Sequence, residues 1–194
     1  LLDRYYEGEN RLERIGIAVP PELEMFKAAV NVPRLAVDEV VARQNLRTFQ
    51  RSKGKEDPAL NDAWAYNNLA SRSTLVHQEA RIQGESFVSV SSNPDDKTMP
   101  LITVETGITA DVSPRGLMRS AARFYADDVL GSSTPIRKAT LYLPGSTTWF
   151  KTVGGRWIVD PDIEPDKHGL GRVPLVMFLN RPRAGKWDGR SEMA

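Results

Sequence analysis

Four acidic residues alternate in a short, proline-containing segment and form the first group in this sequence that could do chemistry. They are Asp160, Asp162, Glu164 and Asp166. Carboxylate oxygens at such spacing are ligands that calcium and magnesium prefer. The glycine and the final glutamate of a calcium-binding EF-hand loop are missing, and Pro161 and Pro165 hold the backbone extended. The pattern therefore favours a solvated acidic loop, with a small metal-dependent hydrolase as an alternative.

The two histidines, His77 and His168, have no partners in the sequence that indicate catalysis. His77 lies in a predicted helix, and His168 lies in a predicted turn. The nucleophile motif Gly-x-Ser-x-Gly of serine hydrolases is absent. The chain contains no cysteine, which excludes disulfides, thiolate metal sites and cysteine nucleophiles. We expect no catalytic residue, no metal ligand and no cofactor.

A basic loop is the main candidate for contact with DNA or with a protein partner. Its cations are Arg47, Arg51, Lys53 and Lys55. Glu56 follows directly and dilutes the positive charge. The whole chain has 26 Lys and Arg against 25 Asp and Glu, a net charge of +1, whereas a dedicated nucleic-acid clamp usually carries a basic stripe. A solvated loop is favoured, and a nucleic-acid-binding module remains an alternative.

The composition predicts one compact body that does not cross a membrane. A chain of 194 residues with 40% hydrophobic residues can bury a core of its own. The most apolar run, residues 173–179, is far shorter than the ~20 residues that a membrane-spanning helix requires. We therefore expect no membrane partner.

Apolar residues recur at helical spacing up to Gly84 and predict four helices. The first is expected after Pro20–Pro21, and the second follows Asn31 and extends to Val41. The third begins with Asp57 as the N-cap and a proline in the first turn. The fourth is expected from a Ser71 cap to residue 83, because Gly84 is a typical helix end.

After Gly84 the apolar residues alternate or form short runs, which is typical of strands. Strands are predicted at residues 86–90, 101–105, 118–125, 137–143, 147–152, 156–159 and 173–179. Turns are expected at 111–116 and at the Gly154–Gly155 hairpin. Trp149 and Trp157 could form a cross-strand pair in that hairpin. The predicted fold class is α+β, with amino-terminal amphipathic helices packed on a mostly antiparallel sheet of short strands.

The two ends of the chain suggest a piece of a longer protein. The chain starts on Leu1 without an initiator methionine, and an Arg-Ser-Glu-Met segment near Ala194 could open a new helix. The predicted organisation is a mainly helical part over 1–84 and an antiparallel β part of the same region over 85–182. Residues 183–194 would start a truncated following segment.

An ordered series of short segments resembles a known family. The segments are residues 5–8, 28–34 leading into 37–38, 84–90, 100–105, 141–144, 168–174, 180–182 and 189–192. Together they resemble the amino-terminal half of portal proteins from tailed double-stranded DNA bacteriophages, of the siphophage type common in actinobacterial phages and prophages. The resemblance covers nearly the whole chain.

The resemblance implies a structural role without an enzymatic activity. Portal subunits form a ring, usually of twelve, at one capsid vertex, through which double-stranded DNA is packaged by the terminase and later ejected. This segment would be mainly the wing, whereas stem, clip and DNA-gripping loops would follow Ala194. The implied partners are other portal subunits, capsid and scaffold proteins, the terminase, the head–tail connector and the DNA in the channel. The implied location is the virion, and the host bacterial cytoplasm during assembly.

The resemblance also predicts how this piece behaves alone. Since the missing stem helices would supply much of the contact between subunits, we expect a monomer or a weak oligomer.

Overall fold

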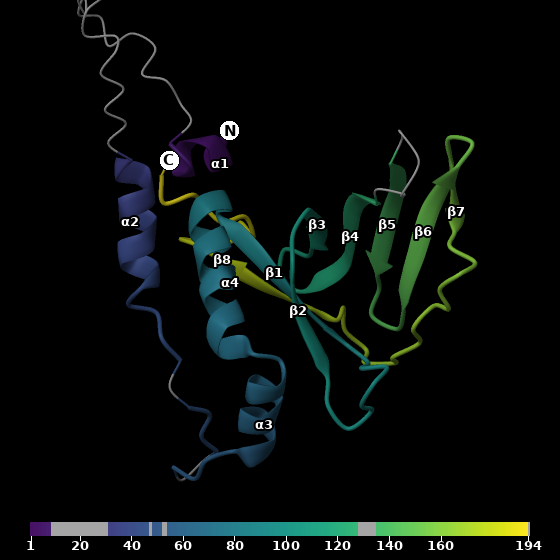
Figure 1. The fold of residues 1–194 in the computed structure, drawn as a ribbon, viewed down its shortest axis with the longest axis horizontal. Helices are drawn as coiled ribbons and strands as arrows, with labels where there is room; N and C mark the ends of the chain where they lie inside the picture. Colours follow the sequence, from purple (N-terminus) through teal and green to yellow (C-terminus); the bar gives the residue numbers. More distant parts are fainter. Residues whose placement is uncertain (9–30, 47, 52–53, 128–134, 194) are drawn as a thin grey trace, which may run out of the picture.

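The computed structural model describes residues 1–8, 31–46, 48–51, 54–127 and 135–193 (Figure 1). The helices are α1 Leu2–Tyr6, α2 Val32–Val41, α3 Pro58–Tyr66 and α4 Leu69–Gln83. The strands are β1 Glu85–Ser91, β2 Leu101–Glu105, β3 Ile108–Val112, β4 Met118–Asp127, β5 Ile136–Tyr142, β6 Thr147–Val153, β7 Arg156–Val159 and β8 Leu175–Leu179. All strand pairs are antiparallel, so the predicted α+β class is confirmed.

The strands form two sheets, where the sequence predicted one. One sheet has the order β2-β1-β8, and the other has the order β3-β4-β5-β6-β7. Strand β8 joins the first sheet from far along the chain, with Phe87 opposite Met177. In Figure 1 the helices lie on one side of β1, β2 and β8, and the five-stranded sheet lies on the other.

Two of the predicted helix starts are confirmed. The Asn31 side chain accepts a hydrogen bond from the Arg34 amide at 3.1 Å, which caps α2. The Asp57 side chain accepts one from the Leu60 amide at 3.4 Å, and Pro58 stands at the first helical position of α3. These side chains satisfy amides that have no partner inside the helix. The helix predicted after Pro20–Pro21 lies outside the described residues.

The predicted start of α4 at Ser71 is wrong, because α4 begins at Leu69. Asn67 and Asn68 lie between α3 and α4, and Asn68 takes a left-handed conformation with φ of 49° that interrupts the helical backbone. The neighbouring Asn67 is buried and ties the break to β2, since its side chain donates to the Pro100 carbonyl and accepts from the Ile102 amide. The predicted end at Gly84 is confirmed, with φ of 96°.

Helix α4 covers one face of the three-stranded sheet. The hydroxyl of buried Ser86 donates to the Val76 carbonyl at 2.8 Å, which holds β1 against the helix. His77 packs edge-on against Phe178 of β8, with ring centroids 6.0 Å apart. On the outer side of α4, Val37, Val41 and Tyr6 form a buried cluster with Ile82.

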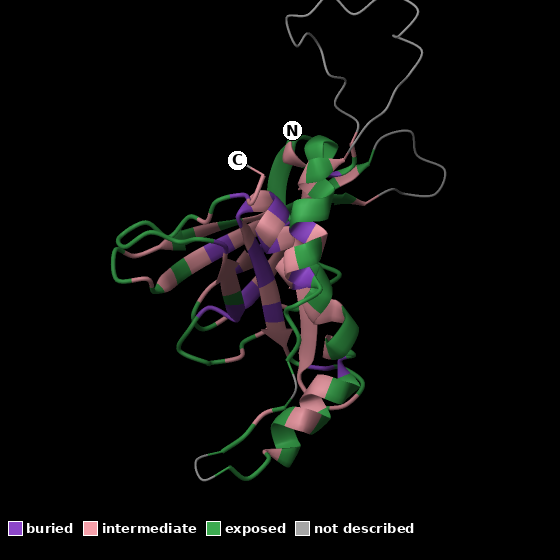
Figure 2. Cartoon of the chain, turned by 90° about the vertical axis from the view of Figure 1, so that its left-hand side faces the viewer, coloured by how far each residue is buried: buried purple, intermediate pink, exposed green. Residues whose placement is uncertain are grey.

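The five-stranded sheet packs on the other face of the three-stranded sheet. The contact is a buried apolar cluster of Ala121, Tyr142, Val173 and Leu175. Figure 2 shows that buried residues gather where α4 and the sheets meet one another. The fold is therefore layered, with the three-stranded sheet as the middle layer.

Two predictions about the five-stranded sheet are corrected. Residues 111–112 belong to strand β3 and not to a turn, and the turn starts only at Ser113. Burial alternates along the whole of β3, and the register of its pairing with β4 shifts between Asp111 and Val112, next to the turn. Trp149 and Trp157 are not opposite each other, because Trp157 pairs with Thr152. Trp157 instead contacts Phe124 edge-on, with ring centroids 6.1 Å apart.

Candidate interaction surfaces

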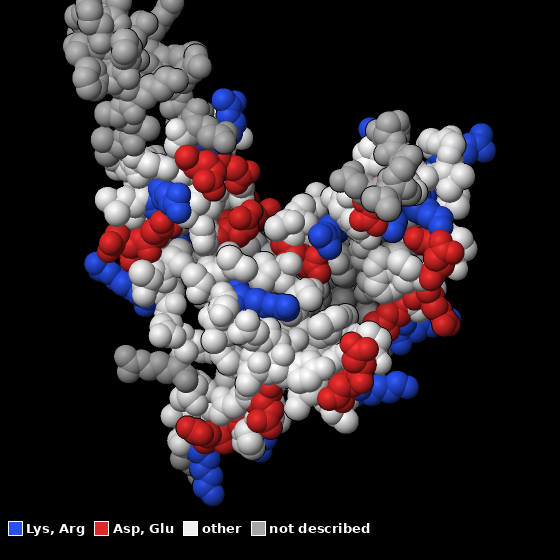
Figure 3. All heavy atoms as spheres, in the orientation of Figure 1, with Lys and Arg blue, Asp and Glu red and all other residues white. Residues whose placement is uncertain are grey.

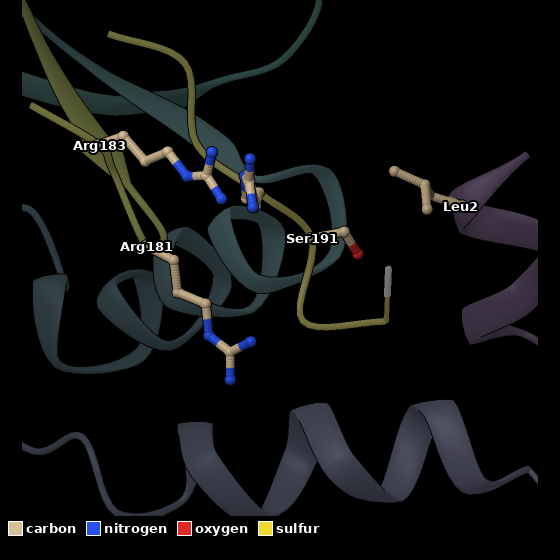
Figure 4. Close-up of a pocket in the computed structure, with 5 residues that line it drawn as sticks. Leu2, Arg181, Arg183 and Ser191 are labelled. Carbon is tan, nitrogen blue, oxygen red and sulfur yellow. The ribbon is translucent and has the colours of Figure 1, made fainter. Parts of the chain in front are cut away.

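A pocket rich in arginine lies between α1 and the segment that follows β8. It encloses about 510 Å³ and is lined by Leu2, Arg181, Arg183, Arg190 and Ser191. Figure 4 shows Arg181 and Arg183 extending from the segment after β8, with Ser191 between them and Leu2 of α1. We call these five residues the arginine pocket.

Backbone hydrogen bonds fix the chain that carries the arginine pocket. The Asn180 amide donates to the Gly84 carbonyl, and the Arg190 amide donates to the Asn180 carbonyl, both at 2.8 Å. The Glu192 amide donates to the Arg81 carbonyl, also at 2.8 Å. Residues 180–192 therefore form a loop that is closed at its base on the end of α4.

Two close contacts hold this loop further. A Cβ atom on Gly189 would overlap the Gly84 carbonyl oxygen, so only glycine fits there. At the tip, the indole of Trp187 lies against Gly116 and donates to the Pro114 carbonyl at 3.2 Å. The arginines thus project from a segment that is anchored at both its base and its tip.

The arginine pocket has an excess of positive charge. Glu192 accepts from Arg81 at 3.2 Å and from Arg181 at 2.6 Å. Hydrogen bonds from the side-chain Nδ2 of Asn180 and from Arg81 hold the pKa of Glu192 below its usual range, so this carboxylate is ionised at neutral pH. Arg183 and Arg190 form no ion pair with another described residue. One carboxylate therefore faces several guanidinium groups.

Uncompensated negative charge lies on α1 and α4. Burial, followed by repulsion from Asp3, raises the pKa of Glu79. In the described part of the chain neither Asp3 nor Glu79 has an ion-pair partner. The Asp3 carboxylate accepts a hydrogen bond from the Gln83 side chain. Figure 3 shows acidic side chains gathered over α1 and the end of α4. We call Asp3 and Glu79 the acidic pair.

A buried ion pair connects the two sheets. Glu105, at the end of β2, accepts from Arg123 of β4 at 2.8 Å, and the two side chains are 9% and 32% exposed. The hydroxyls of Ser89 and Thr103 also donate to Glu105, each at 2.8 Å. Arg123 in turn lies over the ring of Tyr125, 4.9 Å from its centroid. This network fixes how the sheets sit on each other.

The outer face of the five-stranded sheet carries an apolar row that is exposed at Phe124 and Val159 and buried at Ala139. Phe124, Ala139, Phe150 and Val159 stand directly opposite one another on β4 to β7. Phe124 is 58% exposed and Val159 is 48% exposed. The edge strand β7 is exposed along its whole length. Contiguous apolar rows on a surface are a feature of interaction sites in soluble proteins.

Two cations of the predicted basic loop, Arg51 and Lys55, lie among the described residues, and the Arg51 amide donates to the Lys55 carbonyl at 2.7 Å. Arg51 forms a two-point ion pair with Asp57, with its closest contact at 2.6 Å, and that hydrogen bond lowers the pKa of Asp57. Lys55 is exposed. Arg47 and Lys53 lie outside the described residues. Contact of this loop with DNA or a partner stays a prediction.

The acidic segment is held by a lysine. Lys151 of β6 contacts the carboxylates of Asp160 at 2.8 Å and Asp162 at 2.5 Å. The backbone of Asp166 pairs with Thr147, and its carboxylate accepts a hydrogen bond from the Ser92 hydroxyl at 3.5 Å. Across the described residues no three His, Asp or Glu side chains converge as metal ligands would.

The histidines occupy structural positions. Burial, followed by the nearby Arg81 charge, lowers the pKa of His77, so its imidazole is neutral at pH 7 and packs on Phe178. His168 Nδ1 accepts from the Leu170 amide at 3.3 Å, which closes the expected turn.

Sequence reasoning missed the arginine pocket and the Glu105–Arg123 pair. The three pocket arginines stand within ten residues of one another in the sequence, and this spacing was the available signal. Their convergence with Leu2 requires the pairing of β8 with β1, which joins distant parts of the chain.

Comparisons with known proteins show the family of the chain. Residues 1–189 match the family of phage portal proteins described as SPP1 Gp6-like. The chain is 37% identical over 202 aligned residues to the portal protein of Mycobacterium phage D29, and equally so to that of Mycobacterium phage L5. The chain therefore belongs to the SPP1 Gp6-like family of phage portal proteins.

The match covers this chain far more completely than it covers the relatives. Each alignment includes 97% of this chain but 40% of the relative's length. Among the described helices, none has the length and apolar character needed to cross a lipid bilayer.

Proposed function

We propose that this chain is the wing part of a portal subunit in a tailed bacteriophage. The subunits would form a ring at one capsid vertex, through which double-stranded DNA is packaged and ejected. The observation that carries the proposal is the family match over residues 1–189, together with 37% identity along 97% of the chain. Residues 1–84 and 85–182 would form one wing region, and 183–194 would start the next segment.

The chemistry of the chain supports a structural role. The exposed Phe124 and Val159 of its apolar row, together with its positive and negative groups, suit contacts with other proteins. Its net charge of +1 suits a body that lets DNA slide past without binding it tightly. We infer that the working parts are surfaces and that the segment acts without a catalytic residue.

The proposed partners follow from this role. They are other portal subunits, twelve in the complete ring, and capsid and scaffold proteins around it. The terminase and the head–tail connector would bind through parts of the protein beyond this segment. The proposed locations are the virion vertex and, during assembly, the cytoplasm of the bacterial host.

A chimera tests the proposal. Residues 1–189 of this chain replace the aligned segment of the D29 portal protein in a phage that lacks its own portal gene. We expect DNA-filled particles, because the segment would supply an equivalent wing. A matched control carries the aligned segment of the L5 portal protein. DNA-filled particles with the L5 segment but only empty or misassembled shells with this chain would contradict the proposal.

A further inference from the structure

We propose that the arginine pocket binds the acidic pair of a second copy of this chain. The occupant of the pocket is thus a carboxylate surface formed by Asp3 and Glu79 of the neighbouring copy. This inference deepens the proposed function and rests on it, since it names one contact between subunits of the ring.

The first argument is the charge left over on each surface. Arg183 and Arg190 have no carboxylate partner among the described residues, and Glu192 is shared between Arg81 and Arg181. Guanidinium groups hold carboxylates well, because their planar array of N–H donors matches two oxygens. The pocket is therefore suited to an anion with planar oxygens.

The second argument is that the same chain carries the matching anions. Glu79 is partly buried beside Asp3, and no cation of the described chain neutralises either group. Packing two carboxylates together is unfavourable unless a positive group approaches them. A second copy would bring such a group to α1 and α4. Association would then neutralise the charge of the acidic pair and the charge of the arginine pocket together.

The third argument is geometric. A closed ring of more than two identical subunits needs two different surfaces on each subunit, because every contact runs head to tail. The pocket and the acidic pair are two different groups of side chains on one chain, and they adjoin at α1, where Leu2 lines the pocket and Asp3 belongs to the pair. The anchored loop of residues 180–192 also holds the pocket in place before contact, which reduces the entropy lost on binding.

A nucleic-acid phosphate is a weaker candidate for the pocket. Leu2 of α1 forms one wall, and a half-buried leucine suits the methylene groups of a glutamate better than it suits a sugar–phosphate backbone. Duplex DNA is usually held by several cations spread along a face, whereas these arginines line one recess.

Charge reversal with mixing tests the contact. The pocket variant is Arg183→Glu/Arg190→Glu, the acidic-pair variant is Asp3→Lys/Glu79→Gln, and the control Arg156→Glu changes an exposed cation on β7. Sedimentation velocity at increasing concentration measures self-association of the 194-residue chain. We expect weak association that falls in 1 M salt, where the Debye length is about 3 Å. Each variant alone should associate about tenfold or more weakly, and the control should behave as the unchanged chain.

Mixing supplies the decisive result. The pocket variant and the acidic-pair variant together should recover association, because the unchanged pocket of the acidic-pair variant meets the unchanged acidic pair of the pocket variant. A disulfide readout adds specificity, since the chain has no cysteine of its own. Arg183→Cys on one copy should cross-link to Asp3→Cys on another, and Arg156→Cys should not. Failure to cross-link at the highest soluble concentration, or no recovery on mixing, would overturn the proposal.

Two further outcomes separate the alternatives. If the pocket variant leaves self-association unchanged but weakens retention of duplex DNA in a mobility-shift assay, the pocket binds phosphate and the inference is wrong. If the D29 chimera packages DNA equally well with the pocket variant, the inference fails while the proposed portal function stands. If the unmodified chimera makes no particles, the proposed function itself fails.

Discussion

The Glu105–Arg123 ion pair should contribute measurably to the stability of the fold, because it crosses from one sheet to the other. The perturbation is Arg123→Met, which removes the charge and keeps most of the side-chain volume. Glu105 would then keep the hydroxyls of Ser89 and Thr103 but lose its cation at 2.8 Å.

The size of the effect follows from burial. Removal of one partner from a buried ion pair costs about 3–5 kcal/mol. The Glu105 side chain is only 9% exposed, but Arg123 is 32% exposed and keeps part of its hydration. We therefore expect Arg123→Met to lower the free energy of unfolding by about 2–3 kcal/mol. For a chain of this size that corresponds to a fall in Tm of roughly 4–12 °C.

Chemical denaturation of a double-mutant cycle measures the pair itself. The cycle uses Arg123→Met, Glu105→Gln and both together, with a coupling of about 1–3 kcal/mol expected. The coupling energy does not contain the loss of the Arg123 contact with Tyr125, because that loss occurs whether or not Glu105 is replaced and cancels in the cycle. The control is Arg119→Met on the same strand, whose ion pair with Asp111 is exposed and worth at most about 1 kcal/mol. Additivity within about 0.5 kcal/mol, or equal costs for Arg123→Met and Arg119→Met, would refute the reasoning.

Three more predictions follow. Gly189→Ala should cost more than about 2 kcal/mol and loosen the loop on Gly84, whereas Gly145→Ala, which has open space around it, should be nearly neutral in the same denaturation assay. Glu79→Gln should raise Tm at pH 7, because burial raises the folded-state pKa of Glu79 and its ionised form opposes folding. That gain should shrink as the pH falls through the raised pKa, and a gain that grows on acidification would contradict it. Millimolar calcium or magnesium should leave Tm unchanged, because Lys151 already neutralises Asp160, and a rise that Asp160→Ala abolishes would show a metal site.

Local signals in the sequence predicted most of the elements. Asp57 with a following proline marks a helix start, and Gly84 marks a helix end, because both act on backbone groups within one turn. The Gly154–Gly155 turn likewise predicted the hairpin of β6 and β7. These features depend on neighbours in the chain and are therefore visible in the sequence.

The features that were missed depend on distant contacts. The division into two sheets follows from the pairing of β8 with β1, which no local pattern specifies. The Trp149–Trp157 prediction was wrong because the two-glycine turn sets Trp157 opposite Thr152. The arginine pocket and the Glu105–Arg123 pair likewise combine residues from separate elements, so only the folded chain brings them together.

Electron cryomicroscopy of rings purified from the D29 chimera tests the central claim most directly. If the chain is a portal wing, its two sheets, in the orders β2-β1-β8 and β3-β4-β5-β6-β7, should lie at the periphery of each subunit, away from the channel. A reconstruction in which this segment lines the channel, or in which it adopts a different fold, would contradict the account.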